Sequence, residues 1–461
     1  MEQIQKQNKM GILPEGKLLL SMSAPLCISM LMQAIYNLVD SIFVSRLGED
    51  ALTAVSLAYP VQMLMIAVSV GTGVGMNSLI SRRLGERRLE EANRAANNGI
   101  VLLLISAAVF TLFGVFGAKP FFDLFTDVQQ IREMGTDYLR ICCVYCVGVF
   151  MQVGCERILQ AQGQNTAAMI MQLIGAVFNI IFDPILIFGL LGFPAMGIAG
   201  AAIATVGGQL LSMLCCFAVL LLGKYDVTIR LRDCRLAAAT VRDIYQVGVP
   251  SIIMQAIGTV MNLAMNALLI AYSTTAVAVF GVYFKIQSVV FMPVFGMTNA
   301  AMSIMAYNFG ARSRSRLLRT MRLMLFAALA LMAIGLVCFQ LFPAEILLLF
   351  EASEDMLGIG VPALRIISTC FLFAAVGISF STFFQAIGSG IYSMMLSLIR
   401  QLVVLVPAAF VLSAIFHSLD AIWCAFPIAE LFALVTSLLF FRTVYKKQIE
   451  HLEDPSFSFY K

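Results

Sequence analysis

Two aspartates stand inside long apolar stretches of this sequence, where a charged side chain is unfavourable. Asp40 and Asp183 each lie about six residues before the outer end of such a stretch, so both are predicted roughly 9 Å below one membrane surface. Asn179 precedes Asp183 by one helical turn, and Tyr36 precedes Asp40 in the same way. Buried carboxyls resist ionisation and titrate together when close, so this pair could exchange protons. With amide and carbonyl oxygens the same group could hold a sodium ion, and we predict an ion site at Asp40, Asn179 and Asp183.

Further polar residues in the apolar stretches are candidates for a substrate cavity. Gln33 lies one turn before Tyr36 and Asn37, on the same side of the predicted first helix. Lys285 is predicted about 12 Å below the outer surface, either facing a cleft or snorkelling toward the interface. Arg400 and Glu430 also lie in apolar stretches, but their predicted depths differ too much for us to pair them, and both could be structural.

The composition excludes a water-soluble globule. Of 461 residues, 60% are hydrophobic and only 12% are charged, and the mean hydropathy is +0.91. Soluble proteins are closer to half apolar and a quarter charged. Charge-free stretches such as 95–118, 189–223 and 244–284 are long enough to cross a bilayer as helices. They are apolar on all sides, whereas barrel strands alternate, so we predict an all-α integral membrane protein.

Twelve apolar segments of membrane-spanning length follow one another along the sequence. The first is too long for the core of a signal peptide and lacks a small-residue cleavage site, so we expect it to be retained. We predict transmembrane helices near residues 18–46, 52–80, 95–117, 136–160, 164–189, 196–223, 245–272, 277–306, 320–342, 361–386, 392–416 and 421–441.

Basic residues gather in alternate loops, which sets the predicted orientation. With the N-terminus inside, the cytoplasmic segments are 82–94, 156–163, 223–244, 312–322, 387–391 and the C-terminal tail. The opposite loops are acidic and include Asp123, Asp127 and Glu345. The net charge of +4 therefore reflects membrane topology and not nucleic acid binding. We expect a bacterial inner-membrane protein with both termini cytoplasmic.

The two halves of the sequence align with each other at a single offset of 225 residues. Unrelated apolar helices share Leu and Ala by composition, but not this many Gly, Pro and Arg. The matched residues include Pro25 with Pro250, Asn37 with Asn262, Gly71 with Gly296, Ser78 with Ser303, Arg87 with Arg312, Arg94 with Arg319, and Gly163 with Gly388.

Each repeat contains six predicted spans, so the two repeats share one orientation and form two lobes around a central cleft. The second repeat lacks both aspartates: Asp40 aligns with Met265, and Asp183 aligns with Ala408. We therefore assign the ion site to the N-lobe alone. The predicted division is a cytoplasmic segment at 1–17, the N-lobe at 18–223, a linker at 224–244, the C-lobe at 245–441 and a cytoplasmic tail at 442–461.

Several motifs together resemble the multidrug and toxic compound extrusion (MATE) family. Each of them alone is weak, but the set extends over nearly the whole chain with its twelve spans and two lobes. The motifs are the segment from Tyr36 to Gly48, Ala51-Leu52-x-Ala54-Val55-Ser56, Gly85-Glu86-Arg87, the segment from Phe178 to Pro184, and the segment from Gly197 to Thr205.

The resemblance implies a secondary transporter that exports cationic and amphipathic compounds in exchange for protons or sodium ions. The acidic pair looks like that of the bacterial and archaeal members with an ion site in the N-lobe. We expect the substrate cavity to contain Gln33, Tyr36, Asn37, Thr205 and Lys285. The alternative is a lipid-linked oligosaccharide flippase of the same superfamily. Such a cavity should carry several basic residues, whereas Lys285 is nearly alone against two acids.

No sequence motif indicates another class of activity. Gly71-x-Gly73-x-Gly75 lies within a predicted span, and there is no Walker motif, so we do not expect a bound nucleotide. The only histidines, His417 and His451, lie outside any catalytic spacing. Cys143 and Cys146 lie in an apolar helix without a second pair, so we predict neither a metal site nor redox chemistry there. We expect a monomeric transporter that is not an enzyme and has no cofactor, with H⁺ or Na⁺ as the coupling ion.

Overall fold

The computed structural model of the chain describes residues 8–223, 225–229, 235–350 and 352–452. Within these residues, ten helices are long and apolar enough to cross a membrane, and two further pairs of helices each form one bent span. The predicted all-α architecture with twelve spans is therefore confirmed. The outer parts of the two predicted terminal segments, 1–7 and 453–461, and the linker residues 224 and 230–234 lie outside the described residues.

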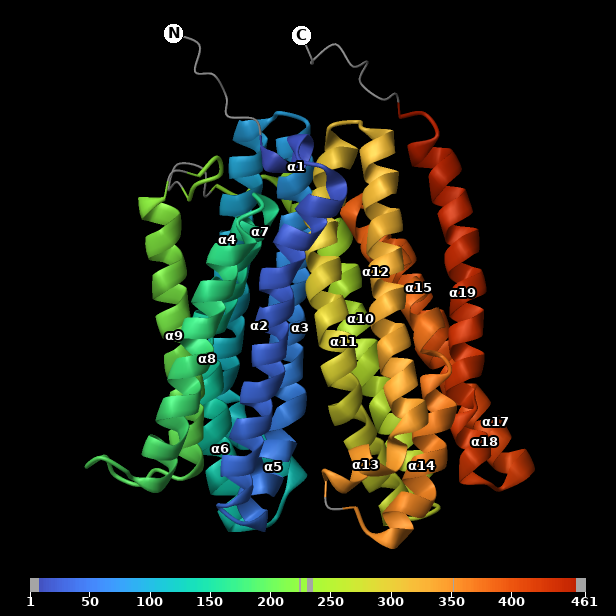
Figure 1. The fold of residues 1–461 in the computed structure, drawn as a ribbon. Helices are drawn as coiled ribbons and strands as arrows, with labels where there is room; N and C mark the ends of the chain where they lie inside the picture. The colour runs from blue at the N-terminus through green and yellow to red at the C-terminus, as the bar shows by residue number, and fades with distance from the viewer. Residues whose placement is uncertain (1–7, 224, 230–234, 351, 453–461) are drawn as a thin grey trace. The chain divides into compact units, whose positions relative to one another are not determined.

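One compact unit, which we call unit 2, comprises residues 28–252. It contains most of the first repeat and also the beginning of the second (Figure 1). Its elements are the second part of α2 (Glu15–Ser45), α3 (Glu49–Gly85), α4 (Leu89–Phe116), α5 (Ala118–Phe125), α6 (Gln129–Val144), α7 (Val147–Ala161), α8 (Asn165–Phe188), α9 (Ile198–Leu222) and the first part of α10 (Ala238–Ile270).

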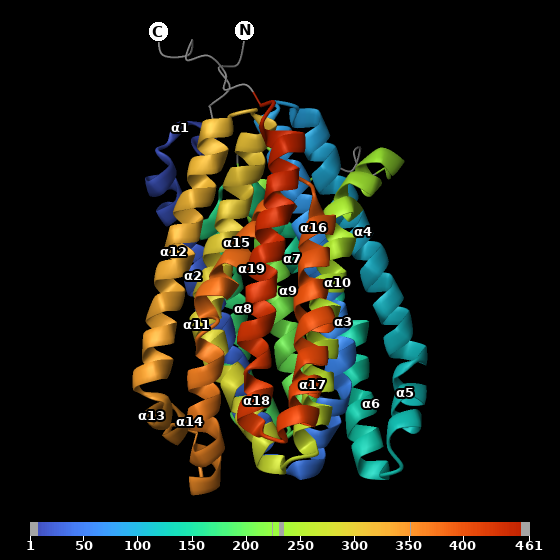
Figure 2. The same ribbon diagram turned by 90° about the vertical axis from the view of Figure 1, so that its right-hand side faces the viewer.

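The other compact unit, unit 1, comprises residues 1–27 and 253–461. In this unit α15 packs against both α12 and α19 (Figure 2). Besides the remaining parts of α2 and α10, its elements are α1 (Lys9–Ile12), α11 (Thr274–Gly310), α12 (Arg314–Leu341), α13 (Pro343–Leu348), α14 (Glu354–Ser368), α15 (Phe371–Ala386), α16 (Gly390–Leu398), the π-helical segment η2 (Ile399–Leu405), α17 (Val406–Phe416), α18 (Leu419–Trp423), α19 (Ala425–Val444) and the π-helical segment η3 (Tyr445–Ile449).

The repeat seen in the sequence extends to the backbone geometry. The pair α6 and α7 is bent by 41°, and the pair α14 and α15, which follows at the same offset, is bent by 50°. Arg87 and Arg312 both adopt left-handed backbone conformations, with φ of 60° and 56°, in the turns after α3 and α11. Non-glycine residues seldom adopt this conformation, so its occurrence at matched positions supports a duplicated fold.

The two bent spans were predicted as single helices at 136–160 and 361–386. A break inside a membrane frees backbone carbonyls, which need other donors. At the first break, the Thr111 hydroxyl of α4 lies 3.4 and 3.3 Å from the carbonyls of Cys143 and Val144. At the second, the Gln340 amide of α12 donates to the carbonyl of Arg365 at 2.7 Å. Neighbouring helices therefore satisfy the freed groups.

The boundaries of the compact units fall inside α2 and α10 and not in loops. They lie between Cys27 and Ile28 and between Ile252 and Ile253, at positions that correspond under the 225-residue offset. Each boundary follows a helical proline, Pro25 or Pro250, by two residues. The predicted lobes assign these two helices whole to their own repeats, whereas the compact units divide them.

Matched glycines explain why each unit contains the first part of the other repeat's first helix. In unit 2, a Cβ on Gly71 of α3 would lie 2.8 Å from the backbone nitrogen of Ile252. In unit 1, a Cβ on Gly296 of α11 would lie 2.7 Å from the backbone nitrogen of Cys27. Real Cβ contacts are longer, so only glycine allows these backbones to pack so closely.

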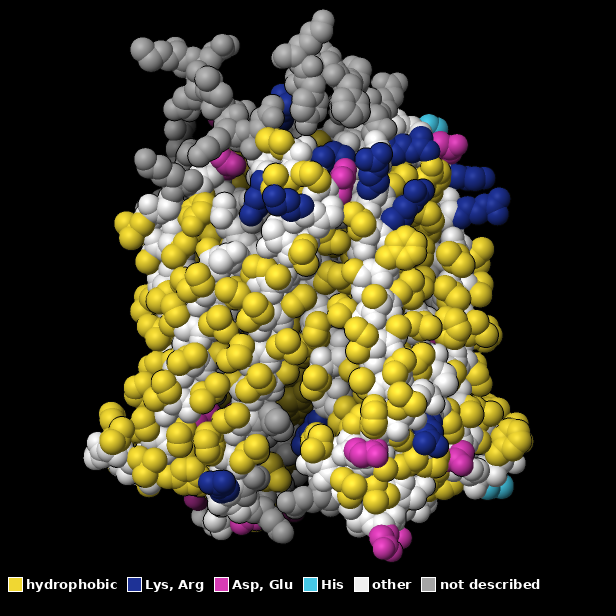
Figure 3. Space-filling view, in the orientation of Figure 1, with side chains coloured by type: hydrophobic (Ala, Val, Ile, Leu, Met, Phe, Trp, Pro, Cys, Tyr) yellow, Lys and Arg dark blue, Asp and Glu magenta, His cyan; other side chains and the backbone are white. Residues whose placement is uncertain are grey.

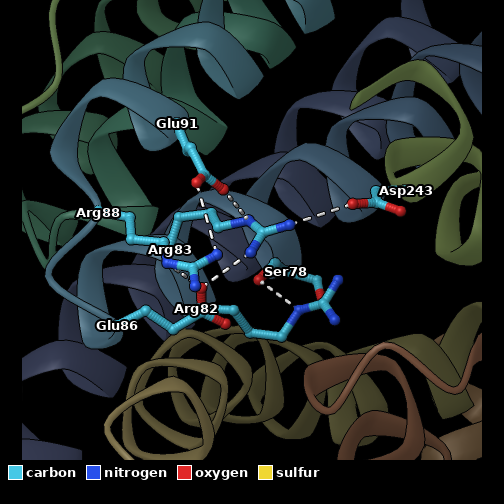
Figure 4. A network of polar contacts seen from close by, with 7 residues as sticks. All are labelled: Ser78, Arg82, Arg83, Glu86, Arg88, Glu91 and Asp243. Carbon is cyan, nitrogen blue, oxygen red and sulfur yellow. Dashed lines mark hydrogen bonds and ion pairs between the residues drawn. The ribbon is translucent and has the colours of Figure 1, made fainter. Parts of the chain in front are cut away.

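On the face shown in Figure 3, charged side chains lie mainly at the helix ends. On the visible face, hydrophobic side chains cover the middle of the helices, while Lys and Arg gather at the end that carries α1 (Figure 3). At this end of unit 2, Arg83 pairs with Glu86, Glu91 and Asp243 at 2.8, 3.2 and 3.2 Å, and Arg88 contributes further ion pairs (Figure 4). The network joins the turn between α3 and α4 to the start of α10.

Candidate functional site

The two predicted aspartates come together in unit 2. Asp40 of α2 and Asp183 of α8 lie within hydrogen-bonding reach of each other. Asp183 is fully buried, and the Oδ1 atom of Asp40 is buried without a hydrogen-bond donor among the described residues. Two carboxylates cannot both stay ionised at such a short distance in an apolar environment. The arrangement therefore needs a shared proton or a bound cation between the carboxyl groups.

Asn179 connects this pair to a third helix. The O and N atoms of its amide are assigned from the hydrogen-bond network, because only one orientation satisfies all partners. In that orientation the amide nitrogen donates to Asp183 at 3.1 Å, and the amide oxygen accepts from the backbone N–H and hydroxyl of Thr205 at 3.3 and 3.2 Å. Thr205 belongs to α9, so the polar chain runs from α2 through α8 to α9.

The close packing of α8 and α9 places Thr205 within reach of Asn179. Gly175 and Gly208 face each other across this helix pair, one turn from the two polar residues. A Cβ on Gly208 would come within 2.6 Å of the Gly175 carbonyl oxygen, a distance that no other residue can accommodate. Small residues at such positions are the usual way for membrane helices to approach each other closely.

Other predicted cavity residues lie along the same side of α2. The Gln172 amide of α8 donates to the side-chain oxygen of Gln33 at 3.3 Å. Tyr36 is half-buried, contacts Gln33 and lies within electrostatic range of both aspartates. Asn37 is exposed. Thus Gln33, Tyr36 and Thr205 join the environment of the carboxyl pair, while Asn37 lies at its margin.

A second layer of polar residues adjoins the pair and was not identified from the sequence. The Gln62 amide of α3 donates to the hydroxyl of Tyr138 of α6 at 3.1 Å and lies 3.5 Å from the sulfur of Cys142. Tyr138 is buried and within electrostatic range of Asp40 and Asp183. A single glutamine or tyrosine in an apolar span gives no depth signal strong enough to place it beside an acid.

Glu156 lies where the predicted span 136–160 overlaps the predicted cytoplasmic segment 156–163. α7 ends at Ala161, close to the predicted end of the span, and Glu156 and Arg157 are both buried with 8% and 7% exposure. Glu156 accepts a hydrogen bond from Gln152 at 3.0 Å and lies within electrostatic range of Tyr36. In the sequence, the spacing of Gln152 and Glu156, one helical turn apart, was the signal that could have indicated this hydrogen bond.

Two predictions concern unit 1. Lys285 is exposed on α11, and its role stays a prediction. Arg400 and Glu430, which the predicted depths had kept apart, form an ion pair at 3.4 Å. The predicted depths had left this pair open, because they were counted along the helices and take no account of the reach of a long arginine side chain.

The carboxyl pair is suited to binding a proton or a small cation. Asp40 and Asp183 supply carboxylate oxygens, and Pro184 lacks the N–H that would bond the Ile180 carbonyl one turn earlier. Of the predicted ion-site residues, all three lie in one contiguous polar cluster of unit 2.

Relatives of known type are similar to this chain over nearly its whole length. A protein named as an FAD transporter from Shewanella oneidensis is 26% identical, with 91% of this chain and 92% of the relative aligned. The probable multidrug resistance protein YoeA from Bacillus subtilis is 25% identical over 96% of both chains. The multidrug export protein MepA from Staphylococcus saprophyticus is 24% identical over 90% and 91%.

Solved structures agree with the sequence comparison. A crystal structure of a MATE protein in complex with MaL6 has a TM-score of 0.92 and 28% identity, covering 97% of this chain and all of the other. A multidrug resistance MATE family transporter solved in an outward-facing conformation gives the same TM-score, identity and coverages. The MatE family itself matches residues 25–185 and 250–411, two segments that begin at the repeat offset. The chain therefore belongs to the MatE (multidrug and toxic compound extrusion) family.

Proposed function

We propose that this chain is a multidrug efflux transporter that exports cationic or amphipathic small molecules in exchange for protons or sodium ions. The observation that carries the proposal is the contact between Asp40 and Asp183 inside a membrane-spanning unit. An exporter driven by an ion gradient needs a group whose charge changes when the ion binds. The names of the relatives, which include multidrug export proteins and an FAD transporter, support export over lipid-linked oligosaccharide flipping.

The proposed mechanism begins with the pair sharing one proton, so that it carries a single negative charge. Its charge attracts a cationic substrate from the cytoplasmic side, in a bacterial inner membrane that leaves both termini cytoplasmic. When a proton or sodium ion enters from outside, the pair is neutralised and its attraction for the cargo is lost. Because the Asn179 amide contacts both Asp183 and Thr205, the change at the carboxyl also alters the contact between α8 and α9. Alternating access then follows from a different preferred packing of unit 2 in each ionic state.

The remaining candidate residues take supporting roles in this proposal. Gln33 and Tyr36 orient cargo near the carboxyl pair, and Asn37 lies at the entrance. The Thr205 hydroxyl holds Asn179 in place. Lys285 of α11, which is exposed, faces the transport path as the partner of an acidic group.

Dye efflux from proteoliposomes tests the proposal. The purified protein is reconstituted with a fluorescent cationic dye inside, and pH and sodium gradients are imposed separately on the wild type, Asp40→Asn and Asp183→Asn. We expect one gradient to drive wild-type efflux and both variants to lose that response. Asp420→Asn is the matched control, because Asp420 is an exposed aspartate on α18 and should pump like the wild type.

Each result has a defined meaning. If both aspartate variants retain gradient-driven efflux, the coupling site lies elsewhere and the proposal fails. If neither gradient moves dye through correctly folded wild-type protein, the exporter function itself fails, and lipid-linked cargo becomes the next substrate to test.

A further inference from the structure

Unit 1 contains a membrane-embedded cavity that the proposed ion site does not use. Its volume is about 500 Å³, within the usual range for small-molecule sites. The lining combines aromatic rings, flexible methionines and neutral amides from α10, α11, α15, α16, η2 and α19. Residues that represent these classes are Tyr283, Phe291, Phe426, Met261, Gln255 and Gln401.

Arg400 and Glu430 are the only charged residues that line this cavity within the described part of the chain. Both lie within predicted membrane spans, where ionised side chains usually mark a functional site. Arg400 and Gln401 belong to η2, a π-helical segment, and such segments occur frequently at functional sites. The cavity therefore has an apolar body and one ionic end.

The arginine is the more accessible member of the ion pair. Its side chain is 26% exposed, against 14% for Glu430, and the Oε2 atom of Glu430 is buried without a hydrogen-bond donor among the described residues. The pair has one long contact, from Nη1 of Arg400 to Oε1 of Glu430 at 3.4 Å. A guanidinium carries five N–H donors in a planar fork, so this contact leaves most of them available to a second anion.

We propose that this cavity is a second ligand site, which binds aromatic compounds that carry one anionic group, either a carboxylate or a phosphate. The anion accepts hydrogen bonds from Arg400, while the aromatic body packs among Tyr283, Phe291 and Phe426. Glu430 competes with the ligand for the guanidinium and so limits its affinity. This site is separate from the carboxyl pair of unit 2 and adds an anionic class of ligand to the cationic one proposed above.

The chain carries its own reporter for this site. Trp423 is its only tryptophan, is fully buried, and stacks on Phe280 with ring centroids 6.1 Å apart. Phe280 in turn lies 6.1 Å from Phe426, which lines the cavity. An anthracene derivative absorbs where tryptophan emits, so its binding quenches the fluorescence of Trp423 by energy transfer.

Three probes with the same ring system separate charge from shape: anthracene carboxylate, anthracene methanol and aminomethyl anthracene. Quenching of Trp423 is titrated with each probe in the wild type, Arg400→Gln and Glu430→Gln. We expect the wild type to bind the carboxylate roughly tenfold to a hundredfold more tightly than the alcohol, the range for a hydrogen bond to a charged group. Arg400→Gln should abolish this preference, and Glu430→Gln should increase it, because the competing carboxylate is gone.

Matched variants keep the test decisive. Asp420→Asn, at an exposed aspartate on α18 outside both sites, should leave the preference unchanged. If a single substitution leaves an unpaired buried charge and the protein does not fold, the double variant Arg400→Gln/Glu430→Gln removes both charges and should bind the carboxylate and the alcohol equally. Equal binding of the two probes by the wild type, or a carboxylate preference that survives removal of Arg400, overturns the proposal. So does tightest binding of the ammonium probe that is lost in Glu430→Gln, since that indicates a cation site.

Discussion

The contact between α8 and α9 gives a direct test of how the ion site is positioned. In Gly208→Ala, the new Cβ would lie 2.6 Å from the Gly175 carbonyl oxygen, whereas ordinary contacts begin at 3.4 Å. Both partners are helix backbone, so the helices must separate. Overpacking of this kind costs about 1–3 kcal/mol of folding free energy. Because Asn179 and Thr205 lie one turn from the two glycines, their 3.2 Å contact should lengthen as well.

Two measurements follow this substitution. The first is thermal unfolding with a thiol-reactive dye, which suits this chain because most of its described cysteines are buried or half-buried. A loss of about 1–3 kcal/mol should lower the melting temperature by about 2–4 °C per kcal/mol for a unit of this size. The second is the response of dye efflux to the driving gradient, which should weaken.

Gly207→Ala is the matched control on the same helix turn. Its Cβ would meet only a ring atom of Phe178, at 2.9 Å, and a side chain can move aside more readily than a helix backbone. We therefore expect a smaller change in melting temperature. The reasoning is refuted if Gly208→Ala melts and pumps like the wild type, or if Gly207→Ala is equally damaged.

Three further predictions follow from other contacts. Arg83→Gln removes three ion pairs and should lower the melting temperature more than Arg88→Gln does, because the Arg83 side chain is 23% exposed and the Arg88 side chain is 57% exposed. Equal decreases in melting temperature would contradict this reasoning. Thr205→Val removes the hydroxyl that donates a hydrogen bond to the Asn179 amide oxygen. It should shift the ion concentration needed for half-maximal efflux about tenfold, whereas Thr205→Ser should keep the wild-type value. Arg316→Gln removes donors to the carbonyls of Met10 and Leu13 and should speed tryptic cleavage after Lys9, as followed by mass spectrometry; an unchanged rate would show that these bonds do not hold α1 in place.

Much of the architecture could be predicted because membrane spans are defined by length and polarity. The twelve spans and the duplication required only apolar segment lengths and one offset. The matched depths of Asp40 and Asp183 followed from their positions in two spans of one repeat, whereas their proximity depends on how the two helices pack.

The remaining features depend on packing between helices and had weaker signals. The bends at Val144 and Ser368 are stabilised by hydrogen-bond donors on other helices. No proline or glycine lies at either break, so the sequence did not indicate them. The burial of Glu156 was not predicted, because a charged residue near a span end looks the same in sequence whether neighbouring helices cover it or not. The Arg400–Glu430 pair was missed because depth counted along a helix axis ignores the reach of a long side chain.

The division of α2 and α10 between the compact units has a consequence for the history and engineering of this protein. A cut in the connection between α9 and α10 separates the two repeats of the sequence, yet neither fragment then contains a whole compact unit, because residues 1–27 and 238–252 fall on the wrong sides. We expect neither fragment to be stable when produced alone, and both to assemble when produced together. We infer that a chain with a single repeat would meet the same condition, and that a second copy would have to supply the beginning of its first helix.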